Sequence, residues 1–291
     1  MRSFCLAVLL CLISGIRSAE INYNNATYSC SEIICDLSCK ANTDLCKHIA
    51  IIGTIDETTK TFTPFKTAVI LGKQFMITTV SSGFATDFNA NVQMIYFPAQ
   101  TNDGYLFLDR RISSTDAQLI PGDFDPHGWN DIMLIKLKTP HSNSGNSVDV
   151  AQDPEKKRPQ AMARFEVARY GFVVTGSNGI VLKKDITTHS PEDCKKYFAY
   201  DETIFFDEDL MYCQSDEDAK QPPTAEQSKW LSGLPVFDTF TEKAFLVGLR
   251  SIQSSDPHRQ GAFLVTKLKY HCEWIAYHDA EPCISKLFYY N

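Results

Sequence analysis

The feature that most constrains the fold is a series of short apolar runs, separated by turn-forming residues, that recurs from residue 51 onward. Most runs span about four to eight residues and are rich in Val, Ile, Phe and Thr, which is typical of β-strands. They cover residues 67–71, 75–80, 92–97, 105–108, 132–137, 165–170, 172–175, 244–249 and 262–268. Helical patterns are confined to a short stretch after Pro191 and to residues 270–277. The sequence therefore predicts an all-β barrel or sandwich.

The first residues are typical of an export signal. Arg2 supplies a positive charge, residues 4–13 form an apolar run, and small residues near Ser18 and Ala19 offer a cleavage site. We therefore expect residues 1–19 to be a signal peptide. The run is too short to cross a bilayer, and no later stretch reaches the roughly 20 apolar residues that a spanning helix needs. The sequence thus predicts a secreted, extracellular protein without membrane insertion.

The charge balance bears on the partners of the protein. The formal net charge is -7, so no surplus of basic residues exists to attract nucleic acid or an anionic membrane. The basic run at residues 156–158 lies between two prolines, as is typical of a solvated loop. We expect extracellular proteins as partners, and no nucleic acid.

The cysteines indicate disulfides. Two of the ten fall in the signal peptide, which leaves an even number in a chain destined for an oxidising compartment. The paired C-x-x-C spacing of common zinc sites is missing, so we expect neither a metal nor another cofactor. Six cysteines have open pairings: Cys30, Cys35, Cys39, Cys46, Cys272 and Cys283. Cys272 either bonds to Cys283 or ties the N-terminal segment to the remainder of the chain.

Residues 20–49 differ in character from the chain that follows. They hold four cysteines, several Asn and Ser residues and little apolar periodicity. We interpret them as a separate, disulfide-tied segment preceding a domain at residues 50–291. The sequon beginning at Asn25 predicts a glycosylation site there.

Four segments, in order, resemble trypsin-like serine proteases. Residues 51–54 (IIGT) are similar to the start of the mature domain, and residues 130–137 to the strand with the catalytic aspartate. Residues 232–235 resemble the nucleophile loop, and residues 245–249 the strand that follows it. Residues 266–275 resemble the closing strand and C-terminal helix. The resemblance covers residues 51–278. It implies two six-stranded antiparallel β-barrels with a cleft between them and a short C-terminal helix. It also implies a disulfide between Cys194 and Cys213.

The resemblance implies a degenerate catalytic triad. Asp131 and Ser232 match the family's aspartate and nucleophile, whereas Ser81 stands in the place of the histidine. No histidine occurs between residues 49 and 126. A serine hydroxyl without a base is a poor nucleophile at neutral pH, so peptidase activity is not expected.

Other positions of the resemblance also depart from the family pattern. Trp230 replaces a glycine that contributes to the oxyanion hole, and Leu231 replaces the aspartate that binds the new amino terminus after activation. Ala50 stands where zymogens carry a basic residue before the cleavage site. In the specificity pocket, Glu226 occupies the floor position and Gln253 replaces a glycine. We expect the pocket to be remodelled or shut.

The interpretation that follows is a non-catalytic serine protease homologue that binds other extracellular proteins. The resemblance suggests a cofactor, decoy or scaffold for active proteases, in immunity or reproductive secretions of insects or other invertebrates. The alternative is an active hydrolase that uses Ser232 with an unusual base, for which Lys229 is near in sequence. A secreted structural or carrier protein is a third reading.

Overall fold

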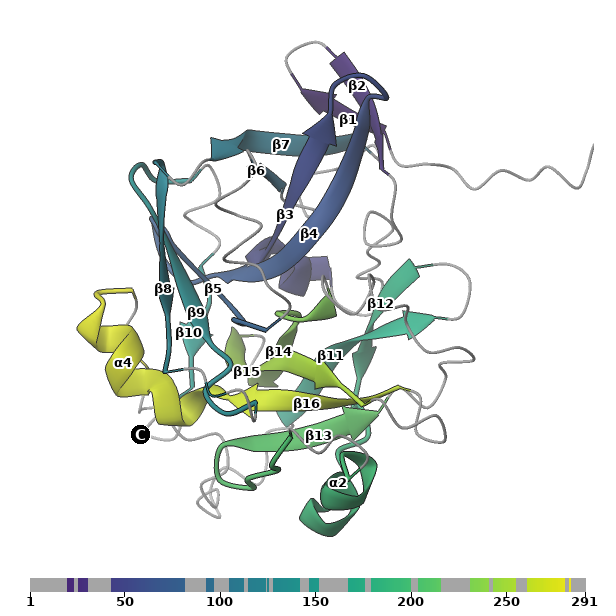
Figure 1. Cartoon of the computed structure of the whole chain (residues 1–291), viewed down its shortest axis with the longest axis vertical. Helices are drawn as coiled ribbons and strands as arrows, with labels where there is room; N and C mark the ends of the chain where they lie inside the picture. Colours follow the sequence, from purple (N-terminus) through teal and green to yellow (C-terminus); the bar gives the residue numbers. More distant parts are fainter. Residues whose placement is uncertain are drawn as a thin grey trace, which may run out of the picture.

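The computed structural model describes residues 20–23, 26–30, 43–81, 93–96, 105–112, 115–123, 125, 128–141, 147–151, 167–175, 179–199, 204–215, 231–240, 243–254, 261–280 and 283. Within them the chain forms two β-sheets, one in the upper half of Figure 1 and one in the lower half, with two short α-helices at the periphery.

Nine strands of the described chain form the first sheet, in the order β2-β1-β7-β6-β3-β4-β5-β9-β8. A further pairing of β2 with β4 closes one part of this sheet into a ring. The strands are β1 (Glu20–Tyr23), β2 (Ala26–Cys30), β3 (Ile49–Asp56), β4 (Thr61–Ile70), β5 (Phe75–Thr78), β6 (Gln93–Tyr96), β7 (Tyr105–Ile112), β8 (Ala117–Pro121) and β9 (Met133–Leu137). A 3-10 helix, η2 (Thr43–His48), leads directly into β3.

The second sheet of the described chain has six antiparallel strands in the order β12-β11-β14-β15-β16-β13, with the two-residue β10 beside β15. These strands are β10 (Asp149–Val150), β11 (Val167–Thr175), β12 (Gly179–Lys184), β13 (Met211–Ser215), β14 (Pro235–Phe240), β15 (Lys243–Gln253) and β16 (Ala262–Lys267). Helix α2 (Pro191–Tyr197) precedes β13, and η6 (Leu268–His271) with α4 (Cys272–Tyr277) follows β16. The predicted all-β architecture with a short C-terminal helix is confirmed.

Strand β3 shows why the first sheet is buried on both faces. Side chains alternate between the two faces of a strand. Ile49 and Ile51 belong to one core cluster, whereas Ala50 and Ile52 belong to another. The first cluster also contains residues of the second sheet, among them Phe237. One hydrophobic core therefore joins the two sheets.

Two segments of the N-terminal part are built into the first sheet. The segment 51–54 lies inside β3 and pairs with β4 on one side and β6 on the other. Parts of residues 20–49 also contact the chain that follows. β1 pairs with β7, β2 pairs with β4, and Leu45 is buried in the core that joins the sheets. A boundary between residues 49 and 50 falls within β3.

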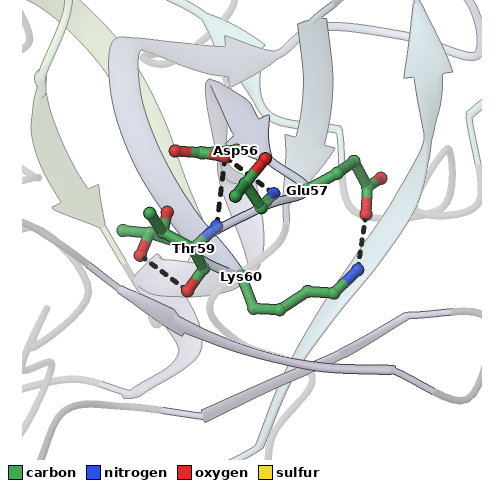
Figure 2. Close-up of polar contacts among 6 residues, drawn as sticks. Asp56, Glu57, Thr59 and Lys60 are labelled. Carbon is green, nitrogen blue, oxygen red and sulfur yellow. Dashed lines mark hydrogen bonds and ion pairs between the residues drawn. The ribbon is translucent and has the colours of Figure 1, made fainter.

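The β3–β4 hairpin is closed by local side-chain hydrogen bonds (Figure 2). Asp56 Oδ1 accepts hydrogen bonds from the backbone N–H groups of Thr58 and Thr59, at 2.8 and 3.2 Å. A side-chain hydrogen bond from Thr59, together with these backbone hydrogen bonds, stabilises the carboxylate and lowers the pKa of Asp56. Lys60, whose φ is 55°, binds Glu57 at 2.9 Å. From this turn the two strands pair from Asp56 with Thr61 to Gly53 with Pro64, beyond which the register shifts.

Two disulfides pin the C-terminal half. Cys194 of α2 bonds to Cys213 of β13, which confirms the pairing that the resemblance implied. Cys272 bonds to Cys283, so the open choice for Cys272 is resolved in favour of a local loop. Cys46 is also disulfide-bonded. Within the described residues, no helix is both long and apolar enough to span a membrane.

Candidate degenerate active site

Three elements bring the expected triad positions together. Ser81 follows β5, Asp131 precedes β9, and Ser232 lies in the loop before β14. Because Thr78 of β5 pairs with Met133 of β9, the end of one strand lies beside the start of the other. Ser81 and Asp131 therefore come from the first sheet and Ser232 from the loop that leads into the second.

Ser81 bridges the other two residues. Its backbone N–H donates to Asp131 Oδ1 at 2.7 Å, and its hydroxyl shares a 2.9 Å hydrogen bond with Ser232 Oγ. Asp131 is fully buried, and its second carboxylate oxygen accepts a hydrogen bond from Ser251 Oγ of β15. The carboxylate thus orients a serine backbone.

The Ser232 hydroxyl is buried among other hydroxyls. Only 2% of Ser232 is exposed, and its Oγ also shares a 2.6 Å hydrogen bond with Thr79 Oγ1. The two hydrogen-bond partners that the described chain gives this atom are therefore the hydroxyls of Thr79 and Ser81. A neutral hydroxyl does not take up a proton at neutral pH, so neither partner can serve as the base that activates a serine.

Gly233 explains how the Ser232 loop approaches the first sheet so closely. Its φ of +96° lies in the region that favours glycine. A Cβ at this position would lie 2.3 Å from Thr67 O and 2.4 Å from Thr78 Oγ1. The Gly233 N–H donates to Arg250 O at 2.7 Å, which ties the loop to β15. A small residue here is a packing requirement whether or not the site reacts.

Leu231 belongs to the apolar core. It is 1% exposed and lies in the same cluster as Ile51. Since Ile51 is in the middle of β3, no amino terminus can form there without breaking that strand. The geometry of residues 51–54 thus does not support activation by cleavage at this point.

Lys66 of β4 is a polar residue of the hydrogen-bonded group around Ser81, and the sequence reasoning missed it. It is fully buried, and its Nζ donates to the carbonyl oxygen of Ser81 at 2.9 Å. Burial lowers the pKa of its ammonium from 10.5 to about 7, and the Asp131 carboxylate offsets only part of that effect. Its place between Phe65 and the apolar run 67–71 is the one sequence signal that indicates burial. Ser251 was missed as well.

The pocket-related position Gln253 binds an arginine of its own strand. Gln253 Oε1 accepts a hydrogen bond from Arg250 Nη2 at 2.5 Å. Arg250 is 3% exposed, and its guanidinium lies 3.9 Å from the ring centroid of buried Phe263 on β16. The ladder between β15 and β16 is irregular here, between Arg250 and Gln253. Three protein side chains therefore pack against one another at this position.

Several expected site residues lie outside the described part of the chain. They are the pocket and oxyanion-hole positions Glu226 and Trp230, the glycosylation site Asn25, and the candidate base Lys229. In the described chain, no group of three or more His, Cys, Asp or Glu side chains is arranged to hold a metal ion.

Together, the two sheets, the C-terminal helix and the site between them define a trypsin-like serine protease fold. No protein-family model matches the sequence, and no curated protein matches it either. Solved structures do match. One is titled "Structure of GrC" (granzyme C, a trypsin-like serine protease), with a TM-score of 0.53 and 14% sequence identity. The match covers 82% of this chain and 96% of that one. This similarity shows the fold.

Proposed function

We propose that this chain is a non-catalytic serine protease homologue that acts by binding other extracellular proteins, as a cofactor, decoy or scaffold. The observation that carries the proposal is the position of Ser81. It lies between the Asp131 carboxylate and the Ser232 hydroxyl, where a catalytic base would have to stand. A residue with no proton-accepting side chain at neutral pH occupies the centre of the site.

Two further features support the absence of catalysis. Ser232 is almost fully buried, whereas a nucleophile has to reach the substrate carbonyl. Near Gln253, the Arg250 guanidinium stacks on Phe263, so protein side chains fill the space next to a position that the resemblance assigns to substrate binding.

Binding is the function that a retained scaffold with a closed site can still perform. Folds carry many unrelated functions, and loops on a rigid framework adapt readily to new partners. The disulfides Cys194–Cys213 and Cys272–Cys283 are consistent with an extracellular protein. We therefore place the partners among secreted proteins, with active proteases as the first class to test.

The test begins with a fluorophosphonate probe on the purified, disulfide-intact protein, with Ser232→Ala as the matched control and an active trypsin-like enzyme as the positive control. We expect no labelling above that of Ser232→Ala. Labelling that depends on Ser232 would contradict the proposal. Cross-linking in the native extracellular fluid, followed by mass spectrometry, then identifies the partners. Recovery of the chain only as an uncomplexed monomer would contradict a binding function.

One observation favours the alternative of an active hydrolase. Lys66 is a buried amine whose pKa of about 7 leaves a large neutral fraction at physiological pH, as an unusual base requires. Its hydrogen bond goes to the carbonyl of Ser81, however, and a carbonyl passes no proton on to Ser232. If Ser232-dependent labelling is found, its loss in Lys66→Met would assign the base to Lys66, and its persistence would assign it elsewhere.

A further inference from the structure

Each polar group of Ser81 contacts a different buried side chain. The N–H binds Asp131, the carbonyl oxygen binds Lys66, and the hydroxyl binds Ser232. A cation and an anion thus hold the backbone of one residue from either side. The arrangement joins β4, the segment after β5 and the segment before β9 to the Ser232 loop.

The surroundings of Lys66 include an opposite charge, Asp131. On the neighbouring strand β3, the residue paired with Lys66 is the apolar Ile52. Asp131, ahead of β9, raises the pKa of Lys66, but less than burial lowers it. Thr79 and Ser232, which are buried, and Ser81, which is partly exposed, contribute neutral hydroxyls to the cluster. A single carboxylate compensates only part of the free energy needed to remove an ammonium from water.

The consequence is a linkage between proton binding and opening of the cluster. Burial lowers the pKa of Lys66 to about 7, whereas an ammonium exposed to water has a pKa near its ordinary value of 10.5. Any opening that hydrates Lys66 therefore takes up a proton between these two pH values. By linkage, the closed arrangement gains stability relative to the open one as pH rises from about 7 to about 10.

We propose that Lys66 makes the Ser81 cluster a proton-sensitive element of the fold. This cluster consists of Lys66, Thr79, Ser81, Asp131 and Ser232. Proton gain by its buried amine loosens the contacts around Ser81, and proton loss tightens them. The device sits where the two sheets meet, so it couples the packing of the first sheet against the Ser232 loop to the pH of the surrounding fluid. It does not depend on whether Ser232 reacts, and it holds for a binding protein and an enzyme alike.

The direct test is an NMR titration of the full, disulfide-intact protein with ¹³C-labelled lysine. We expect one lysine Cε resonance to titrate with a midpoint near pH 7, and that resonance to be missing from the spectrum of Lys66→Met. Titration of every lysine above about pH 9 would overturn the proposal. The wild-type spectrum alone decides this point if Lys66→Met does not fold.

The second test compares equilibrium unfolding by urea from pH 6 to pH 10. The control is Lys136→Met, a partly buried lysine on β9 whose Nζ lies 5.2 Å from the Phe75 ring centroid. Relative to Lys66→Met, the unfolding equilibrium constant of the wild type is expected to fall by up to about tenfold per pH unit above pH 7. Lys136→Met is expected to follow the wild type. Parallel curves for the wild type and Lys66→Met would overturn the proposal.

A third measurement separates local loosening from a change in global stability. The Ser81 N–H donates to Asp131, so its hydrogen exchange reports opening of the cluster. After correction for the intrinsic rate, we expect its protection in the wild type to rise as pH increases through 7, more steeply than that of the Leu71 N–H, which donates to Phe75 O at 3.1 Å. Equal pH dependence of the two amides would contradict a local device.

Discussion

Ser81 and Ser232, which are 151 residues apart in the chain, share a 2.9 Å hydrogen bond between their hydroxyl oxygens. The bond joins the segment after β5 of the first sheet to the loop before β14 of the second sheet. Thr79 adds a 2.6 Å bond to the same oxygen of Ser232. These bonds form a network of hydroxyls whose contribution to stability can be measured.

We predict that Ser232→Ala destabilises the protein by about 1–2 kcal/mol, because it removes the shared partner of the buried Thr79 hydroxyl and the partly buried Ser81 hydroxyl. Urea unfolding at pH 7 measures this loss. The exposed Ser190→Ala change would remove a helix cap instead and serves as a reference of similar size. A stability gain on removing Ser232 would indicate a strained functional site and contradict this view.

For Asp131→Asn, we expect a loss of about 3 kcal/mol at pH 6, since it removes the carboxylate that compensates buried Lys66. The loss is expected to shrink above pH 7. In the wild type the Lys66 amine is largely neutral there, so a compensating charge matters less. Unfolding at pH 6 and pH 9 checks this, and an equal loss at both values would show that the two residues are not coupled.

Gly233→Ala is expected to cost about 3 kcal/mol, because the new methyl group meets the backbone oxygen of Thr67 at a positive φ. Gly128→Ala is the matched control. Its φ is +93°, but the nearest atom is the flexible Ile252 Cδ1 at 3.1 Å, so backbone strain acts there without a backbone clash. Thermal unfolding of both variants compares them. Equal losses would show that close approach of the Ser232 loop contributes nothing.

The burial of His271 predicts that the free energy of unfolding decreases at acidic pH. Burial lowers the pKa of this imidazole from 6.5 to about 4. The unfolded chain therefore binds a proton between pH 6.5 and 4 that the folded chain does not. As pH decreases over that window, the free energy of unfolding decreases by up to roughly 3 kcal/mol. We expect His271→Gln to reduce this pH-dependent loss of stability. His278 is more exposed, so we expect His278→Gln to leave the loss unchanged. The same loss of stability in His271→Gln as in the wild type would show that His271 is not the group responsible.

Much of the fold follows from local patterns in the sequence. The apolar runs at 75–80, 132–137 and 262–268 match β5, β9 and β16, and the stretch after Pro191 matches α2. Residues 167–170 of one run and the run 172–175 belong to one strand, β11, in which a Cβ at Gly171 would lie 2.2 Å from Ile186 Cδ1. The glycine that separates the runs in the sequence is needed for packing within a continuous strand.

The segment 51–54 shows where local patterns fail. Ile-Ile-Gly-Thr fits both the start of a mature protease domain and the middle of a buried strand. The pairing of β3 with β4 and β6 decides between them, and those partners lie nine or more residues away in the chain. Within residues 20–49, β1 and β2 pair with each other and also with β7 and β4, which the segment itself does not contain.

By itself, the sequence determined the strand content, the Cys194–Cys213 pairing that the resemblance implied, and the meeting of Ser81, Asp131 and Ser232. Strand-forming runs are local, and a resemblance carries the relative placement of its motifs. Only the tertiary structure decided that Lys66 is buried beside Asp131 and that Arg250 stacks on Phe263. Burial of a charge depends on which strands and loops close over it, and that is a property of distant segments meeting in the folded chain.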